Sequence, residues 1–467
     1  MADMDAVFKA YDIRGIYPTA VDEDLAWKVG NATAQFLRTH LTGYDRGQAS
    51  ANRLVVGRDM RTHSDSLAHS LIDGIITSGA GCVDIGMVDT PMIYFAINHL
   101  GTCGGIQVTA SHNPPEYNGF KISGQKARPI GENTGLKEIK HIASKARRTQ
   151  PLDTPPSVQR ADLWDAYGRH VRQFLKLPRP LKIVVDASNG MAGKMVPAIF
   201  SETDLEIIPL NFEITGQFVH PPNPLVEANL RMTQDAVVEH AADFGVCFDG
   251  DADRCMFVDE KGHSVGCDLM TALLARHFLK SNPGATVVYD LRSSRVVAEA
   301  ILAAGGTPRR ERVGHAFMKK AIADTHAVFG GELSGHFYFR DNYNADSGAI
   351  VLAVAASVLA AAAVPLSERI APLARYAASG EINFQVADKA AVMDQLAETF
   401  ADAKIDRLDG VTVEYDTWWF NVRPSNTEPL LRLNLEAANE DELSARLKDV
   451  ERILGEPVAH QGGAGHV

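Results

Sequence analysis

The sequence has few cysteines and no C-x-x-C pair. Its five cysteines are Cys82, Cys103, Cys247, Cys255 and Cys267. An odd set without paired spacing predicts free thiols. The first residues, MADMDAVFKAYDIRG, lack the apolar core of a secretory signal. We therefore expect a protein of the reducing cytoplasm.

An excess of positive charge is also absent. The chain has 46 basic and 58 acidic side chains, for a net charge of -12. This balance argues against a general affinity for nucleic acid or anionic membranes, so an anionic ligand would need positive charge gathered locally. The longest apolar run, Gly348 to Val364, is alanine-rich, short for a bilayer and followed by Pro365. It predicts a buried core helix.

The 467 residues exceed what one hydrophobic core supports, so three or four domains are expected. Three successive rounds alternate β-rich runs with helical patterns, and they include RLVVGRD, LKIVVDASNG and TVVYDL. Unbroken Val/Ile strands separated by helices are typical of a parallel sheet covered on both faces. A smaller last segment mixes strands with two helical patterns, AAVMDQLAETFADA and EDELSARLKDVERIL.

Linkers are expected near TQPLDTPPS, around Asp259–Gly262 and near RYAASGE. The chain then divides into four domains and a tail, at residues 1–153, 154–259, 260–373, 374–456 and 457–467. The chain ends in EPVAHQGGAGHV, and this tail is expected to be flexible.

Each of the three rounds ends in a short hydrophobic strand that runs directly into a polar loop. The three stretches are GIQVTASH, GVCFDGDADR and VFGGELSGH. Because ligands bind beyond the carboxyl ends of strands in open parallel sheets, these loops could converge on one cleft.

The first loop, TASHNPPEYNGFK, runs from Thr109 to Lys121 and places Ser111 beside His112. Its two prolines and its glycine exclude a helix or a paired strand at that point. Two interpretations remain open for this stretch alone. It is either a nucleophile held in a rigid, exposed turn or an ordinary surface loop.

The second loop, DGDADR, has Asp249, Asp251 and Asp253 at alternate positions, followed by Arg254. Carboxylates so close together repel unless a cation neutralises them, which favours a hard metal such as Mg²⁺. An EF-hand is excluded because it needs glycine where Arg254 stands, and the strand-like CMFVDE follows. A solvated acidic turn is the alternative.

In the last segment, FNVRPSNTEP places four polar side chains in a turn after a strand: Arg423, Ser425, Asn426 and Thr427. A guanidinium fork, hydroxyls, an amide and free N–H groups suit a phosphate dianion, although this composition is also common in turns.

The loop GGELSGH offers Glu332, Ser334 and His336, whose alternation suits the adjacent hydroxyls of a sugar. Near the start of the chain, KAYDIRG supplies Tyr11 and Arg14 before a glycine. Each of these two motifs is weak when taken alone.

Together these motifs closely resemble the α-D-phosphohexomutase family, and within it the bacterial phosphomannomutase/phosphoglucomutase branch. The resemblance extends from FKAYDIRG to NVRPSNTEP, and TASHNP, DGDADR, GELSGH and RPSNTEP are separately characteristic. It implies a heart-shaped, four-domain α/β enzyme. Three similar domains would have mixed, mostly parallel sheets, a smaller C-terminal domain would be α+β, and all four would border one deep cleft.

The resemblance also implies what each domain contributes. The domain at 1–153 would carry the phosphoserine loop and that at 154–259 the metal-binding loop. The domain at 260–373 would carry the sugar-specificity loop and that at 374–456 the phosphate-binding loop.

Individual roles follow by the same resemblance. Ser111 would carry a phosphoryl group, and one of its oxygens would join Asp249, Asp251 and Asp253 in holding one Mg²⁺. Lys121 is a candidate general acid/base, and the other residues expected near the reacting groups are Arg14, His112 and His336. The implied substrate-binding residues are Tyr11, Arg254, Arg292, His315, Glu332, Ser334, Arg423, Ser425, Asn426 and Thr427.

One position departs from the family pattern. Many members have a lysine in the third-domain D-x-K motif, whereas YDLRSSR has Arg292 here. The charge is retained, but a planar fork replaces a point charge, so the contact geometry changes.

The activity implied by the resemblance is interconversion of mannose 6-phosphate and mannose 1-phosphate through a hexose 1,6-bisphosphate intermediate and activator. Glucose phosphates are expected as further substrates. The alternatives are a phosphoglucomutase, a non-catalytic, metal-dependent phosphosugar-binding protein, or a phosphatase in which water intercepts the phosphoserine. Small hexose phosphates would be the partners, with neither nucleic acid nor membrane, and either a monomer or a dimer is compatible with the sequence.

Overall fold

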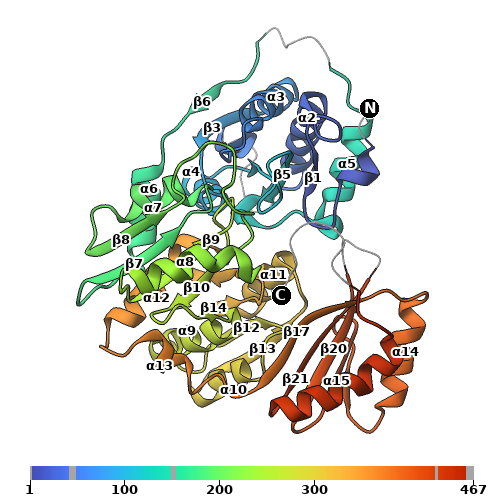
Figure 1. Cartoon of the computed structure of the whole chain (residues 1–467). Helices are drawn as coiled ribbons and strands as arrows, with labels where there is room; N and C mark the ends of the chain where they lie inside the picture. Colours follow the sequence, from blue (N-terminus) through green and yellow to red (C-terminus); the bar gives the residue numbers. More distant parts are fainter. Residues whose placement is uncertain (1–2, 42–48, 149–153, 426–429, 459–467) are drawn as a thin grey trace.

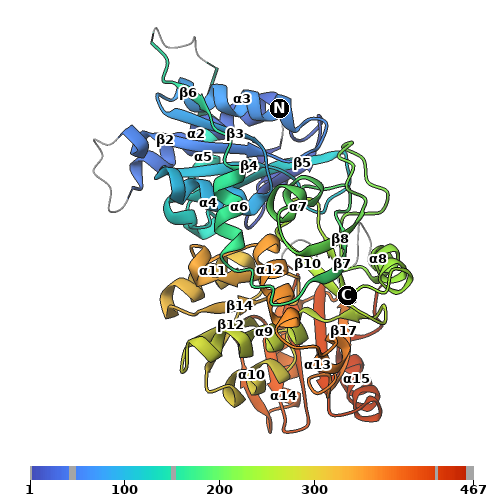
Figure 2. The same cartoon turned by 90° about the vertical axis from the view of Figure 1, so that its left-hand side faces the viewer.

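Four β-sheets follow one another along the described part of the chain (Figure 1). The computed structural model describes residues 3–41, 49–148, 154–425 and 430–458. The tail predicted for residues 457–467 therefore lies mostly outside the described residues. In Figures 1 and 2 the first domain, in blue, lies at the top of the molecule, and the C-terminal domain, in red, lies at the bottom beside the third domain.

The first sheet has six strands in the order β1-β5-β4-β2-β3-β6. Its strands are β1 (Ile13–Ile16), β2 (Arg53–Arg58), β3 (Gly81–Met87), β4 (Gly104–Val108), β5 (Tyr117–Gly124) and β6 (Val158–Arg160). The pairs β4–β2, β2–β3 and β3–β6 are parallel, whereas β5 runs antiparallel to both β4 and β1. Strand β6 thus joins this sheet although it follows the linker expected around residue 153.

Helices cover both faces of the first sheet. They are α1 (Met4–Val7), α2 (Glu23–Thr39), α3 (Ser64–Thr77), α4 (Thr90–Leu100) and α5 (Leu136–Lys145), with short 3₁₀ turns at Ala49–Asn52, Gln125–Ala127 and Glu132–Thr134. Helices α2 and α3 cross in direct backbone contact, because a Cβ at Gly30 would lie 2.1 Å from the Leu71 carbonyl oxygen. Only glycine permits so close a crossing.

The second sheet has the order β11-β10-β9-β7-β8. Its strands are β7 (Leu181–Asp186), β8 (Leu205–Leu210), β9 (Phe244–Phe248), β10 (Cys255–Asp259) and β11 (Ser264–Val265), and its helices are α6 (Trp164–Arg172), α7 (Ala192–Phe200) and α8 (Glu227–Glu239). Strands β7, β8 and β9 are parallel, and the β9–β10–β11 part is antiparallel. Strand β11 lies just beyond the linker expected at Asp259–Gly262.

The third sheet has the order β13-β12-β14-β15-β16. Its strands are β12 (Thr286–Asp290), β13 (Thr307–Glu311), β14 (Phe329–Gly331), β15 (Phe337–Phe339) and β16 (Ala345–Asp346). Its helices are α9 (Cys267–Ser281), α10 (Val296–Ala303), α11 (His315–Thr325), α12 (Gly348–Ala360) and α13 (Leu366–Ile370), with a 3₁₀ turn at Arg340–Asn342. Every residue of α12 is buried, which confirms the core helix predicted from the alanine-rich run.

The C-terminal sheet is antiparallel throughout, in the order β17-β21-β20-β19-β18. Its strands are β17 (Ala377–Phe384), β18 (Lys404–Asp406), β19 (Val411–Glu414), β20 (Trp418–Pro424) and β21 (Leu431–Ala437), and its helices are α14 (Lys389–Thr399) and α15 (Glu440–Leu454). The two helices lie where the sequence pattern predicts them.

Buried apolar side chains form separate clusters of unequal size. Among the described residues, one large cluster runs from the α4 face of the first sheet through the second and third domains. The C-terminal domain has a separate cluster of its own. Charged side chains connect it to the third domain, for example Arg310 with Asp406 at 2.7 Å and Glu414 at 2.5 Å.

Every helix in the described ranges falls short of the length and apolar character that a membrane crossing needs.

Candidate active site

A cleft of about 650 Å³ is bordered by side chains from all four domains. Most of the predicted site residues line it, namely Tyr11, Arg14, Ser111, His112, Lys121, Arg254, Arg292, His315, Glu332, Ser334, His336, Arg423 and the third aspartate, Asp253. The polar loops after β4, β9 and β14 thus meet at one place, as the strand ends led us to expect.

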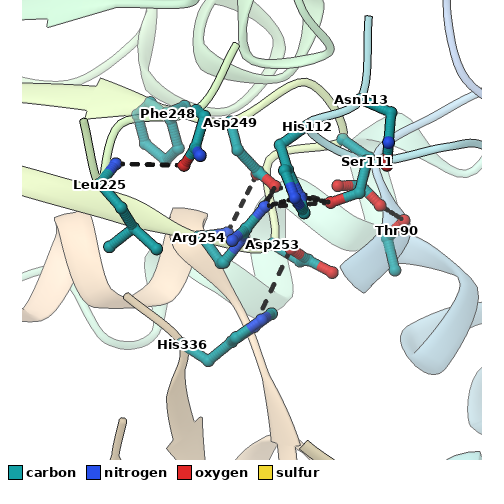
Figure 3. Close-up of polar contacts among 12 residues, drawn as sticks. Thr90, Ser111, His112, Asn113, Leu225, Phe248, Asp249, Asp253, Arg254 and His336 are labelled. Carbon is teal, nitrogen blue, oxygen red and sulfur yellow. Dashed lines mark hydrogen bonds and ion pairs between the residues drawn. The ribbon is translucent and has the colours of Figure 1, made fainter. Parts of the chain in front are cut away.

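Ser111 lies just beyond β4, in a strained backbone conformation. Its φ of 51° is in the left-handed region, which a residue other than glycine rarely adopts, and its N–H donates to Thr109 Oγ1 at 2.9 Å. The Ser111 hydroxyl donates to Asp249 Oδ2 at 2.9 Å (Figure 3). The serine is therefore held by its surroundings and directed at the acidic loop.

The serine loop and the acidic loop pack backbone against backbone. A Cβ at Gly250 would lie 2.4 Å from the Ser111 carbonyl oxygen, so any larger residue would push the two loops apart. The glycine of DGDADR thereby fixes the separation of Ser111 from the aspartates.

The three aspartates of the loop are buried, and their carboxylate oxygens gather within 4.8 Å of one another. Among the described residues, Asp251 Oδ1 and Asp253 Oδ1 are buried oxygens without a hydrogen-bond partner. Hard oxygen donors left unsatisfied in a buried cluster fit a divalent cation such as Mg²⁺. The cluster is therefore able to hold a metal ion.

Two cations from the chain lie against the aspartates. Lys121 Nζ contacts Asp251 at 2.7 Å and Asp253 at 2.5 Å, and Arg254 Nη2 lies 2.9 Å from Asp249. Burial raises the pKa of Asp249 to about 7. Burial opposes the charge of Asp251 as well, but the Lys121 ammonium outweighs it and lowers the pKa of that carboxyl.

The burial of Lys121 also disfavours its charge, yet the surrounding carboxylates raise the pKa of its ammonium above the ordinary value. Arg254 additionally donates to Ser111 Oγ at 3.3 Å and to His112 Nδ1. Figure 3 shows Ser111, His112, Asp249 and Arg254 turned toward one another.

Arg14 contacts the serine loop from β1, which pairs with β5 in the same sheet. It donates to Asn113 Oδ1 at 2.5 Å and pairs with Asp12. Its guanidinium is thereby fixed beside the residue that follows His112.

The loop after β14 contributes Glu332 and Ser334 to the cleft. Glu332 accepts hydrogen bonds from the Gly314 N–H at 3.1 Å and from the Tyr338 hydroxyl, and burial raises its pKa. These bonds fix the carboxyl at the cleft wall, where it can meet a ligand hydroxyl.

Two aromatic side chains face each other at the same wall. The ring of His315, at the start of α11, lies 5.4 Å from that of Tyr11. Burial, followed by the charge of Lys319, holds the pKa of His315 well below its usual value, so this imidazole is neutral. Burial, reinforced by Asp409 and Glu332, raises the pKa of Tyr11 to about 12.

Three arginines surround Glu381 of β17. Arg423 lies 2.8 Å from its carboxylate, Arg432 3.1 Å and Arg292 3.9 Å. Arg292 also pairs with Asp290 at 2.9 Å, so it is anchored in the third domain while it faces the fourth. Three guanidinium groups around one carboxylate leave a net positive charge for an anion.

Of the other residues predicted for the phosphate-binding turn, Ser425 is partly buried and its N–H donates to Leu430 O at 2.9 Å. It does not line the cleft in the described part of the chain. Asn426 and Thr427 lie outside the described residues.

Sequence reasoning missed several residues of this region. Arg432 lines the cleft and stands opposite Arg423 in the β20–β21 ladder, but LRLNLE carries no motif. Asp346 contacts His336, and Arg61 contacts the serine loop, each from a distant segment. The one sequence signal for Arg432 was the alternation of polar and apolar residues in LRLNLE, which is typical of a strand that could pair with FNVRP.

The sequence matches four family models in succession. Their descriptions are "Phosphoglucomutase/phosphomannomutase, alpha/beta/alpha domain I" for residues 5–150, domain II for 165–262 and domain III for 267–376, and "Phosphoglucomutase/phosphomannomutase, C-terminal domain" for 381–453.

Curated relatives align along almost the whole chain. A phosphomannomutase of Escherichia coli (strain K12) is 38% identical over 463 residues, covering 96% of this chain and 99% of the relative. Phosphohexose mutases of Xanthomonas campestris pv. campestris (strain B100) are 38% identical over 454 residues, covering 96% and 98%. A crystal structure of a phosphoglucomutase/phosphomannomutase family protein from Burkholderia thailandensis superposes with a TM-score of 0.88 at 32% identity, covering 97% of this chain and 98% of the other.

Proposed function

Because the chain belongs to the phosphoglucomutase/phosphomannomutase family, whose members are isomerases, we propose that it interconverts mannose 6-phosphate and mannose 1-phosphate. Relatives named phosphomannomutase support the mannose substrates, and the family name phosphoglucomutase/phosphomannomutase supports glucose phosphates as further substrates. The observation that carries the proposal is the hydrogen bond from Ser111 Oγ to Asp249 at the floor of a cleft rich in arginine.

We propose that Ser111 carries the phosphoryl group. In the first half-reaction its Oγ–P bond breaks while a bond forms between phosphorus and a free hydroxyl oxygen of the hexose monophosphate. The proton of that hydroxyl passes to a general base, and Ser111 Oγ regains a proton from a general acid. The product is a hexose 1,6-bisphosphate. After it turns end for end, its other phosphoryl returns to Ser111 Oγ and the isomeric monophosphate is released. Positioning and electrostatics supply most of such catalysis.

Asp249, Asp251, Asp253 and an oxygen of the phosphorylated Ser111 would hold the divalent ion, for which Mg²⁺ is our proposal. When bound, it offsets the negative charge that develops on the transferred group. The chain itself contributes Arg254 beside Ser111 Oγ and holds the serine backbone in one conformation.

Proton movement is assigned to groups that border the serine. Lys121 is the proposed general acid/base, because its ammonium lies at the serine's end of the cleft, held by Asp251 and Asp253. His112 follows Ser111 in the serine loop, Arg14 donates to Asn113 of that loop, and His336 lines the same cleft from the third domain. We assign these groups to the reacting end.

The distant phosphate is proposed to bind Arg423, together with Ser425, Asn426 and Thr427 of the same turn. Arg292 supports it from the third domain, as a retained charge in place of the family's lysine. Glu332 and Ser334 would accept the sugar hydroxyls, with Tyr11 and His315 beside them.

The domain limits at 153, 259, 373 and 456 remain our proposed division, one functional loop to each domain. We also propose a cytoplasmic location, since all five cysteines are buried free thiols.

The decisive experiment combines mass spectrometry with assays of mannose 1-phosphate and glucose 1-phosphate side by side. We expect one added phosphate on the Ser111 peptide, and we expect Ser111→Ala to lose most turnover while keeping its fold. Near-normal mutase activity in that variant would reject the covalent mechanism. Release of inorganic phosphate without isomerised sugar would indicate a phosphatase, and binding without turnover a phosphosugar-binding protein.

A further inference from the structure

We propose that Arg61, which does not line the cleft, is a positioning residue that holds the Ser111 loop in the geometry needed for phosphoryl transfer; this inference rests on the function proposed above. Arg61 follows β2, whose end is joined to that of β4 because the Asp59 N–H donates to Val108 O at 2.9 Å. The Arg61 side chain is fully buried beneath the loop.

The guanidinium of Arg61 is bonded almost entirely to the backbone of the serine loop. It donates to four carbonyl oxygens, those of Ser111 at 2.9 Å, Asn113 at 2.6 Å, Pro114 at 2.6 Å and Tyr117 at 3.1 Å. Ser111, Asn113 and Pro114 lie outside the strands, and Tyr117 is the first residue of β5. For the three residues outside the sheet, one side chain replaces the hydrogen bonds that a neighbouring strand would supply.

All the donors of the guanidinium are used. Nη1 and Nη2 each serve two carbonyls, and Nε donates to Asp59 Oδ2 at 3.1 Å. An arginine has five N–H groups in a rigid fork, so this arrangement matches its capacity fully. A lysine could not reproduce it, because its three donors radiate from a single atom.

The hydrogen bond from Arg61 to the Ser111 carbonyl affects the position of Ser111 Oγ, which is the proposed reacting oxygen. That carbonyl is fixed between Arg61 Nη2 on one side and the backbone of Gly250 on the other. With φ at 51°, Ser111 would relax toward a more common conformation if the carbonyl were released, and its Oγ would turn away from Asp249. Arg61 therefore controls the direction of Oγ without contacting it.

The second domain closes the far side of Arg61. The guanidinium lies 5.4 Å from the ring centre of Phe218, in the loop between β8 and α8. This loop is anchored by the Val219 N–H, which donates to Asn189 Oδ1 at 2.9 Å, and by His220, which bonds to Asp186 at 3.1 Å. A stacked aromatic ring excludes water that would otherwise compete for the four carbonyls.

The test is Arg61→Lys, with Arg58→Lys as the matched control on the same segment. Arg58 pairs with Asp65 at 2.8 Å and lies outside the cleft. For Arg61→Lys we expect kcat to fall by about 100-fold, the cost of a reacting atom displaced by roughly 1 Å, with little change in KM. The ³¹P resonance of the phosphoserine should also shift, whereas Arg58→Lys should alter neither.

A second variant, Phe218→Leu, keeps the loop apolar but removes the ring from the guanidinium. It should lower kcat less than Arg61→Lys while shifting the same ³¹P resonance. If Arg61→Lys fails to fold, the kcat and the ³¹P resonance of Phe218→Leu test the inference in its place.

Wild-type kcat in Arg61→Lys, or an unshifted resonance in both variants, would overturn the inference. A rise in KM as large as the fall in kcat would also overturn it, since that would show disturbed substrate binding instead of a displaced Oγ. If wild-type protein itself had neither mutase turnover nor a phosphoserine signal, the proposed function would fail first and this inference with it.

Discussion

His336 Nδ1 lies 2.8 Å from Asp346 Oδ2, a bond that joins the loop between β14 and β15 to β16. On its other oxygen Asp346 receives Lys319 Nζ at 2.7 Å. Burial opposes a charge on His336, but the carboxylates of Asp253 and Asp346 raise the pKa of its imidazole. The carboxylate therefore fixes the ring with Nδ1 toward Asp346 and leaves Nε2 for the cleft.

We expect Asp346→Asn to lower kcat by about 100-fold or more, because an amide can turn its NH₂ toward Nδ1 and favour the wrong tautomer. Steady-state kinetics with mannose 1-phosphate will measure this. Asp324→Asn on α11, where the carboxylate pairs with Lys320 at the surface, is the control and should remain active. Full activity in Asp346→Asn would show that the histidine needs no such partner.

Gly250→Ala should separate the serine loop from the aspartates. The added Cβ would lie 2.4 Å from Ser111 O, and since both contacting groups are backbone, a loop must move. We expect a loss of about 100-fold in kcat from this displacement. Gly168→Ala on α6 is the comparison, because its nearest neighbour is the far end of the Arg172 side chain, at 3.0 Å, and alanine favours a helix. An active Gly250→Ala enzyme would mean that the loops tolerate a wider spacing.

Arg432→Met should weaken substrate binding more than it slows chemistry. A hydrogen bond to a charged group contributes about 1.5–3 kcal/mol, so KM should rise by roughly 10-fold to 100-fold while kcat changes little. Initial rates over a range of hexose phosphate concentrations will separate the two constants. Arg452→Met, on the exposed side of α15, serves as the control. An unchanged KM would place the bound phosphate away from β21.

Asp89 should make stability depend on pH. Burial raises its pKa to about 7, and its Oδ2 accepts from the Tyr167 hydroxyl at 2.9 Å. The folded protein then binds this proton more tightly than the unfolded chain, whose aspartate has a pKa near 3.9. Its contribution to stability is therefore present at low pH and is lost as pH rises from about 4 to about 7.

Asp89→Asn removes that titration. Its Tm should rise relative to wild type as pH increases from about 5 to about 8, by an amount equivalent to about 3 kcal/mol. The folded aspartate keeps its proton over about two pH units of this interval, and one unit corresponds to roughly 1.4 kcal/mol. Thermal melts of both proteins at the two pH values will measure the difference. An equal gap at both values would mean that Asp89 stays ionised throughout.

Much of this site could be predicted from sequence because its chemistry is concentrated in loops at strand ends. Ser111, the three aspartates and Glu332 each follow a short buried strand, and parallel strands bring such loops to one edge. The alanine-rich run of α12 could likewise be predicted as a buried helix, because it has no polar stripe; every residue of this helix is buried.

The remaining residues depend on how separate segments pack. Arg61 and Asp346 act on loops far from them in sequence, through contacts that no local spacing encodes. Strand β6 illustrates the same limit, because its three residues are exposed and lack an apolar pattern, yet they pair with β3.

The separate core of the C-terminal domain has a consequence for turnover. Among the described residues no apolar cluster joins this domain to the other three, and Arg310 of β13 reaches it through ion pairs. A swing of the domain would exchange such pairs for hydrated charges, whereas an apolar interface would have to expose its surface to water. In the proposed mechanism, such a swing would release one end of the bound bisphosphate, so that the sugar could reorient while every domain stays folded.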